Sequence, residues 1–170
     1  MSLSLYDASV PVYLHMLRNL ESFLDKAEAH AKAQGVDLST YVEARVAPDM
    51  HPLNRQIQFA SDAAKGGVAR LAGVTAPSFE DTETSFPELR ARIAKTIAYV
   101  GSITPAQMEG DDNRTIELKF PNGAMTFTAR DFLLQFSLPN FMFHVVTTYN
   151  LLRGQGVPLG KMDFLMVRPA

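Results

Sequence analysis

Residues 138–154 read LPNFMFHVVTTYNLLRG, and the organisation of this stretch decides the fold. Apolar side chains occur on every side of the helix that it would form, which is typical of a helix buried within protein. Four polar residues lie among them: Asn140, His144, Thr147 and Thr148. Because buried polar groups are normally hydrogen-bonded, these residues either form a structural network or line a site for a metal ion or another ligand.

The residues before this helix predict a β-hairpin and a helix start. Residues 115–128, TIELKFPNGAMTFT, alternate apolar and polar side chains with the period of a β-strand, and Asn122-Gly123 is a typical tight turn. Thr128 is placed to cap the helical stretch that follows. Pro139 is expected to kink or restart that stretch.

Three further amphipathic helices are predicted upstream. Residues 10–34 carry apolar side chains at alternating spacings of four and three, as one face of a bundle helix requires. A second apolar face covers residues 53–71, and Asp49 is expected to cap this helix. A third covers residues 85–103.

We therefore expect one all-α domain over residues 1–170, a four-helix bundle with a small β-hairpin inserted before the last helix. A chain of 170 residues is long enough for one buried core and short for two domains. Because an isolated two-stranded hairpin is marginally stable in water, the hairpin should lie against the bundle or against another subunit.

Composition excludes several classes of function. The formal net charge of −2 comes from scattered acids and bases, so neither nucleic acid nor a membrane is expected as a partner. No apolar run approaches the ~20 residues of a membrane span, and no signal peptide is recognisable, so a cytoplasmic location is expected. The absence of cysteine excludes disulfides, thiolate nucleophiles and cysteine-ligated metals.

Candidate site residues lie on the second and last helices. His144 is the central one, and the ligand-binding residues expected around it are Asn140, Thr148, Tyr149 and Gln56. Three interpretations stay open for His144: a hydrogen-bonded structural network, a ligand pocket without metal, and a metal site. A buried polar group without a partner costs roughly 1 to 3 kcal/mol, so each interpretation requires partners or a solvent-filled cleft.

Two stretches carry a resemblance to a known family. APDMHPLNRQIQFASDAAKGGVARLAG (residues 47–73) and PNFMFHVVTTYNLLRGQGVPLGKMDF (residues 139–164) resemble uncharacterised bacterial proteins of the DinB/YfiT-like superfamily, and the likeness covers nearly the whole chain. The residues that carry its specificity are Asp49, Gln56, Asp62, Lys65, Phe143, His144, Tyr149, Leu152, Arg153, Gly156, Gly160 and Lys161. The resemblance implies a four-helix bundle that is often dimeric, so a homodimer is expected.

The better-known branches of this superfamily bind a divalent metal through three histidines, usually one on the second helix and an H-x-x-x-H pair on the last. Here the match is partial, because His144 takes the first position of the pair but Thr148 stands four residues later. His51 and Asp49 would have to complete the set, so His51, His144 and Asp49 are the expected ligands of Zn²⁺, Ni²⁺ or Mn²⁺. An enzyme with such a site would be a metal-dependent transferase or hydrolase.

Two functions from different classes follow. The leading one is an interior site around His144 that binds a small molecule or a divalent metal. The competing one is a non-catalytic dimeric helical protein whose buried His, Thr and Tyr network only fixes core packing. The sequence names neither a substrate nor a reaction.

Overall fold

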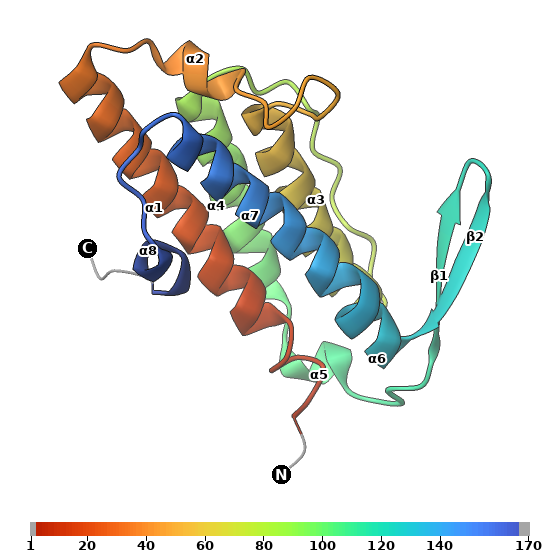
Figure 1. The fold of residues 1–170 in the computed structure, drawn as a ribbon. Helices are drawn as coiled ribbons and strands as arrows, with labels where there is room; N and C mark the ends of the chain where they lie inside the picture. Colours follow the sequence, from red (N-terminus) through yellow and green to blue (C-terminus); the bar gives the residue numbers. More distant parts are fainter. Residues whose placement is uncertain (1–2, 167–170) are drawn as a thin grey trace.

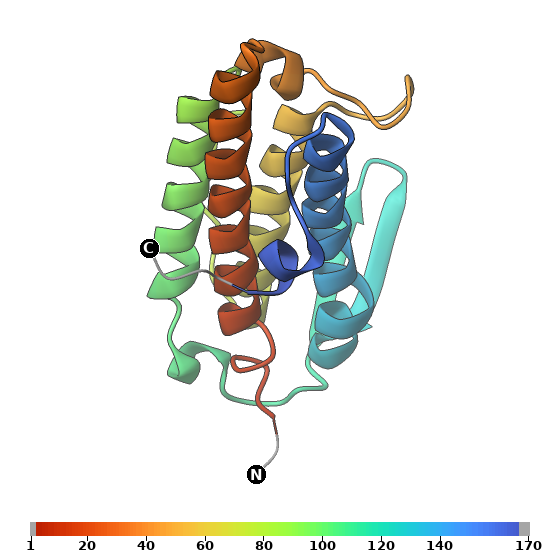
Figure 2. The same cartoon turned by 60° about the vertical axis from the view of Figure 1, so that its left-hand side comes forward.

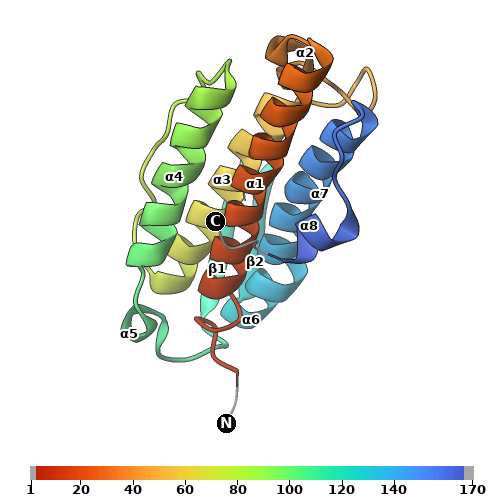
Figure 3. The same ribbon diagram turned by 90° about the vertical axis from the view of Figure 1, so that its left-hand side faces the viewer.

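The computed structural model describes residues 3–166, and most of these are helical (Figure 1). Four helices of 17 residues or more lie side by side: α1 (Val10–Gln34), α3 (Leu53–Ala72), α4 (Phe86–Ser102) and α7 (Leu138–Gly154). Helix α3 packs against both α4 and α7, and α1 packs against the same two helices. Figure 3 shows α1 and α3 between α4 on one side and α7 on the other.

Shorter elements connect the long helices. They are α2 (Leu38–Val42), α5 (Pro105–Met108), β1 (Thr115–Phe120), β2 (Gly123–Thr128), α6 (Ala129–Asp131), the π-helix η1 (Phe132–Ser137) and α8 (Lys161–Leu165). Within the described residues, no helix combines the length and apolar character needed to cross a membrane.

The apolar faces predicted from the sequence form the core. The fully buried residues of these faces are Tyr13, Leu17, Leu20 and Leu24 on α1, Leu53, Ile57, Ala60, Ala64 and Leu71 on α3, and Leu89, Ile93 and Val100 on α4. The first two long helices end where glycine adopts the left-handed conformation, at Gly35 with φ of 67° and Gly73 with φ of 66°.

The predicted hairpin is confirmed, with a shift of one residue at its turn. Gly123 pairs with Phe120 as the first residue of β2, so Pro121 and Asn122 form the turn instead of Asn122 and Gly123. The φ of Gly123 is 143°, a conformation that other residues rarely adopt. One face of β1 is buried through Ile116 and Leu118, and Figure 2 shows the hairpin beside α7.

Residues 129–154 follow one helical path whose winding changes at η1. Thr128 Oγ1 accepts a hydrogen bond from Asp131 N–H at 3.0 Å, which confirms the predicted cap. Pro139 has no N–H, so the carbonyl of Gln135 loses its α-helical donor. The kink expected at Pro139 is therefore realised as a wide π turn immediately before α7.

The predicted role of Asp49 as a helix cap is wrong. The N-cap of α3 is Pro52, and Asp49 is exposed in a turn three residues earlier. The first helical N–H, of Leu53, donates to the carbonyl of Ala44 at 3.0 Å. Because a backbone carbonyl satisfies this donor, the helix starts without a side-chain cap.

The polar side of α3 is covered by residues 74–85. Gln58 and Lys65 are 1% and 7% exposed, although both are polar residues outside the apolar face of this helix. Gln58 donates to Glu83 Oε2 at 2.8 Å, and Phe79 lies against the ammonium group of Lys65, 4.5 Å from its ring centroid. An intramolecular segment therefore buries these polar residues.

Candidate functional site

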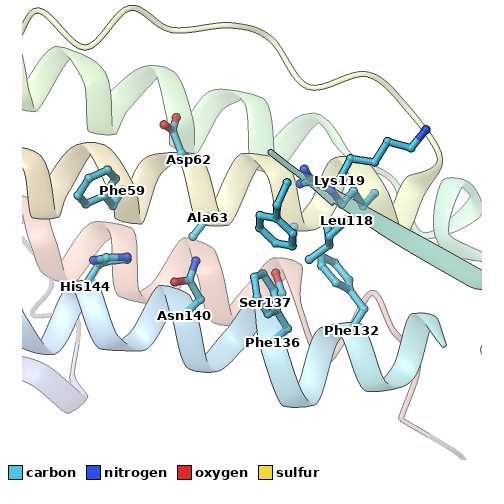
Figure 4. Close-up of a pocket in the computed structure, with 13 residues that line it drawn as sticks. Phe59, Asp62, Ala63, Leu118, Lys119, Phe132, Phe136, Ser137, Asn140 and His144 are labelled. Carbon is cyan, nitrogen blue, oxygen red and sulfur yellow. The ribbon is translucent and has the colours of Figure 1, made fainter. Parts of the chain in front are cut away.

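A cleft of about 400 Å³ opens between α3, η1, α7 and β1. Helix α3 lines it with Phe59, Asp62, Ala63, Gly67 and Arg70; the first three are labelled in Figure 4. The opposite wall comes from Phe132, Phe136 and Ser137 of η1 with Asn140 and His144 of α7, and β1 closes one end with Leu118, Lys119 and Phe120. The cleft thus combines an apolar, largely aromatic wall with nearly as many polar and charged side chains, which could orient a bound small molecule.

Asn140 and His144 bring the predicted polar face of α7 into this cleft. They are four residues apart and so share one helical face, and Figure 4 shows both projecting from α7 toward α3. Within residues 3–166, neither the Asn140 amide nor Nε2 of His144 is hydrogen-bonded to a protein group. Both side chains are partly exposed, so a molecule entering the cleft can reach them.

Gln56 determines which nitrogen of His144 carries the proton. Its Nε2 donates to the carbonyl of His51 at 3.0 Å, which turns the amide oxygen Oε1 toward Nδ1 of His144 at 2.9 Å. An amide oxygen only accepts, so Nδ1 must donate and Nε2 is left as an unprotonated acceptor. Gln56 is 2% exposed, and both ends of its amide are satisfied, which holds this arrangement in place.

The surroundings of His144 keep its imidazole neutral. Burial disfavours the charged form and, together with the nearby His51, lowers the pKa of His144 from 6.5 to about 4. Both histidine rings pack against the ring of Phe59. The centroid of the Phe59 ring lies 5.1 Å from that of His51 and 5.1 Å from that of His144. A neutral ring with a bare Nε2 is therefore the form present at neutral pH.

Two adjacent glycines shape the α3 wall. A Cβ atom at Gly67 would lie 2.5 Å from Ser137 Oγ and 2.8 Å from the Tyr13 hydroxyl, two groups that are hydrogen-bonded to each other at 2.8 Å and buried. A Cβ atom at Gly66 would lie 2.7 Å from Nη1 of Arg70, which donates to the Gly66 carbonyl at 2.9 Å. Gly67 permits close packing of the α3 and η1 backbones, and Gly66 permits Arg70 to fold back along α3.

Thr148 and Tyr149, both expected as ligand-binding residues, lie outside the cleft lining. The hydroxyl of Thr148 donates to the carbonyl of His144 at 2.9 Å, and this side chain is fully buried. Tyr149 faces the other side of α7, where its ring meets Phe23 at 5.7 Å and Phe164 at 6.0 Å. Of the five residues expected to bind a ligand, Asn140 and His144 line the cleft and Gln56 orients His144.

The expected metal ligands do not form a chelating set. Within residues 3–166, no group of three or more His, Asp or Glu side chains is arranged to hold a metal ion. Nδ1 of His144 is engaged by Gln56, and the hydroxyl of Thr148, at the position of the second histidine of an H-x-x-x-H pair, is engaged by the helix backbone. His51 and Asp49 are exposed, and a common catalytic zinc site needs three protein ligands, so the residues present do not fit such a site.

Sequence reasoning did not identify the α3 residues of the cleft. Phe59, Ala63, Gly67 and Arg70 recur at three- to four-residue spacing and so lie on one side of the helix. That periodicity is visible in the sequence, but it runs beside the stronger apolar face that begins at Leu53. Only the position of the hairpin and of η1 shows that this second face borders a cleft.

Comparisons with known proteins agree with this architecture. Residues 5–165 match the model of a family described as a domain of unknown function, DUF1993. A crystal structure of a DinB family member protein from Shewanella denitrificans is similar, with a TM-score of 0.89 and 40% sequence identity over 98% of this chain and 94% of that chain. No curated protein matches the sequence.

Proposed function

Because the chain belongs to the DUF1993 family, whose description assigns no activity, we propose a function from the geometry of the cleft. The cleft binds a small organic molecule, and Nε2 of His144 accepts a hydrogen bond from that molecule. Asn140, one turn away on α7, supplies a second polar contact.

The observation that carries this proposal is the hydrogen-bonded chain from the His51 carbonyl through Gln56 to Nδ1 of His144. This chain uses one ring nitrogen and leaves the other as an acceptor in a partly apolar cleft. Such preorganisation is typical of binding sites, because the orienting partners are satisfied before a ligand arrives. The π-helix in the cleft wall supports the same conclusion, since π turns occur frequently at functional sites.

Three broader expectations remain part of the proposal. The four long helices correspond to the four-helix bundle of the DinB-like superfamily, and the close structural similarity to a DinB family member protein supports this assignment. The homodimer and the cytoplasmic location stay predictions from the sequence.

Binding of a phenol-bearing probe tests the role of His144. We would titrate 4-(4-hydroxyphenyl)butyrate into ¹⁵N-labelled protein and follow amide shifts, using the wild type, His144→Ala and the control His51→Ala. His51 is exposed and packs on the same Phe59 ring, so its loss should leave binding nearly unchanged. Loss of the His144 acceptor should weaken binding about tenfold, as the loss of one hydrogen bond worth ~1.4 kcal/mol would.

Two results would contradict the proposal. One is an absence of shifts in residues that line the cleft, and the other is equal affinity in the wild type and His144→Ala. Thermal melts of each variant establish that the protein is folded under the conditions of the titration.

The competing function is a structural one, and the complete burial of Gln56 favours it. On this reading the His51, Gln56 and His144 chain only fixes packing between α3 and α7. Then His144→Ala would lower the free energy of unfolding by about 1 to 3 kcal/mol and would have no effect on binding by any molecule in the cleft.

Metal addition tests the remaining alternative. Because the residues present do not fit a three-ligand site, Zn²⁺, Ni²⁺ or Mn²⁺ should leave the Tm unchanged relative to protein in EDTA. A ligand that binds only the folded state raises the Tm, so a rise that disappears in the double variant His51→Ala, His144→Ala would contradict this expectation.

A further inference from the structure

The cleft carries a positive charge at the end opposite His144, and this bears on the class of ligand. Resting on the proposed function of the cleft, we propose that the ligand is an elongated organic acid with an apolar or aromatic body, whose carboxylate is bound by Arg70. Three features of the cleft support this: its balance of charge, its aromatic wall and the spacing between its two polar ends.

Arg70 lines the cleft without an acidic partner among the described residues. Its Nη1 donates to the carbonyl of Gly66 at 2.9 Å, a neutral acceptor, so the guanidinium charge is not neutralised. Asp62 is the acidic residue of the cleft lining, and its carboxylate is already paired with Lys65 at 2.8 Å and Arg92 at 3.0 Å. The cleft therefore has a net positive charge, and a guanidinium group suits a planar carboxylate.

The hairpin adds a second cation to the cleft. Lys119 also lines it, and its side chain is 82% exposed, with Glu117 at 3.5 Å as its weak partner. An exposed pair of this kind contributes little. Lys119 therefore adds to the positive potential at the mouth without fixing the position of a carboxylate.

The wall between the two ends is apolar. Phe132 and Phe136 stack with their centroids 6.1 Å apart and an interplanar angle of 22°, and Leu118 of β1 lies in the same lining. An aromatic or aliphatic body in contact with these residues would remove apolar surface from water.

The spacing along α3 requires an elongated molecule. Phe59, beside His144, and Arg70 are eleven residues apart, which corresponds to about 16 Å along the helix axis. The long side chain of Arg70 reduces the gap, because Gly66 lets it fold back along α3. A molecule with a hydrogen-bond donor at one end and a carboxylate at the other therefore matches the two polar ends of the cleft.

Gly66 supplies a variant that moves the charge without removing it. A Cβ atom at this position would lie 2.7 Å from Nη1 of Arg70, so Gly66→Ala displaces the guanidinium while keeping its charge. Gly101→Ala is the matched control, because Gly101 also lies in a long helix and a Cβ atom there meets nothing within 4 Å. Gly66 lies inside α3 and Gly101 next to the last residue of α4, so the gain in helix propensity is larger for Gly66→Ala.

The experiment compares the binding of 4-(4-hydroxyphenyl)butyrate with that of its primary carboxamide. Each compound is titrated into ¹⁵N-labelled protein, and the backbone amide shifts of the protein are followed. In the wild type and Gly101→Ala, the acid should bind about fivefold more tightly than the amide at low salt, and the preference should shrink as ionic strength rises. In Arg70→Gln the preference should disappear, and in Gly66→Ala it should fall below that of the control.

The outcomes separate this inference from the proposed function. Equal affinity for acid and amide in the wild type, with binding still dependent on His144, would overturn the carboxylate assignment and leave the function standing. An acid preference that persists in Arg70→Gln would overturn the role of Arg70. Failure of both compounds to bind would overturn both proposals.

Discussion

His144 has an acid-base behaviour set by its burial and by two neighbouring residues. Gln56 accepts a hydrogen bond from Nδ1–H, while burial and His51 hold the pKa of His144 near 4, well below the ordinary value for histidine. In the unfolded chain all three influences vanish, so the same imidazole returns to an ordinary pKa of about 6.5. Folding and protonation of this residue are therefore linked.

The linkage predicts a loss of stability on acidification. Between pH 6.5 and about 4, the unfolded state binds a proton at residue 144 that the folded state does not, so the free energy of unfolding falls as pH falls. The slope from one such group is at most about 1.4 kcal/mol per pH unit, and the partial exposure of the ring reduces it. Urea denaturation at pH 7, 6 and 5 should show this slope in the wild type and not in His144→Asn, whereas parallel curves would contradict the linkage.

Arg92 is a second residue whose surroundings determine its contribution to stability. It is 1% exposed on α4, and its guanidinium pairs with Asp62 at 3.0 Å, Asp81 at 2.9 Å and Glu83 at 3.2 Å. Through these partners it fastens residues 74–85 onto α3 and α4. This burial was not predictable from the sequence, since Arg92 lies next to the apolar face and its partners lie on α3 and in residues 74–85.

We predict that Arg92→Met lowers the free energy of unfolding by about 2 to 4 kcal/mol, because it removes the buried cation that Asp62, Asp81 and Glu83 share. Asp62 keeps Lys65 and Asp81 keeps Arg55, but among the described residues Glu83, 12% exposed, is left without a cationic partner. Arg90→Met is the control from the same helix: Arg90 is 27% exposed and pairs with Asp25 and Glu28, so its loss should cost about 1 kcal/mol or less. Chemical denaturation of both variants makes the comparison, and equal losses would count against the buried role of Arg92.

At the scale of elements, two adjacent glycines of α3 have different surroundings, and one of them forms the contact with η1. A run of small residues, Ala63, Ala64, Gly66 and Gly67, lies on this part of α3. In the structure Gly67 makes the close approach, toward Tyr13 and Ser137. Gly66 instead faces only the flexible end of Arg70.

The two glycines should therefore respond to alanine in opposite directions. Gly67→Ala is expected to lower the free energy of unfolding by about 1 to 3 kcal/mol, because the buried Tyr13 and Ser137 cannot move away cheaply. Gly66→Ala should be neutral or stabilising by up to about 1 kcal/mol, the gain in helix propensity. Thermal melts measure both, and a Gly67→Ala protein as stable as wild type would show that the contact is looser than described.

At the scale of the whole molecule, the segment that contains α8 packs against α1. Asn19 Nδ2 donates to the carbonyl of Phe164 at 2.6 Å, Phe164 stacks on Phe23 with centroids 6.4 Å apart, and Lys26 pairs with Asp163 at 2.8 Å. Asn19 is a polar residue of α1 and is 0% exposed. It is buried because a segment 145 residues later covers it.

Removing the aromatic ring of Phe164 should loosen the packing of α8 against α1. Phe164→Ala is expected to lower the free energy of unfolding by about 1 to 3 kcal/mol, since the ring is partly buried, and to speed hydrogen exchange of the α8 amides. Met162 lies in the same short helix and is 56% exposed. Met162→Ala should change the free energy of unfolding by no more than about 0.5 kcal/mol and should leave the hydrogen exchange of the α8 amides nearly unchanged. Similar effects in both variants would argue against a specific role for Phe164.

The parts of the molecule that were predictable from sequence are those set by local chemistry. Periodic apolar residues located the helix over residues 10–34, glycine marked its end, and the strand period located the hairpin. His144 and Asn140 were identified because polar residues stand out in an apolar helix. The burial of Arg92, the covering of Asn19 and the α3 wall of the cleft all depend on segments far apart in the chain, which one sequence does not place.

The central claim is that His144 is a neutral acceptor held ready in the cleft, and long-range ¹H–¹⁵N NMR of its imidazole tests this most directly. We predict that the Nδ1–H tautomer is present at pH 7 and that the ring titrates near pH 4. An Nε2–H tautomer, or titration near the ordinary value of about 6.5, would contradict it and would remove the basis for placing a ligand at this residue.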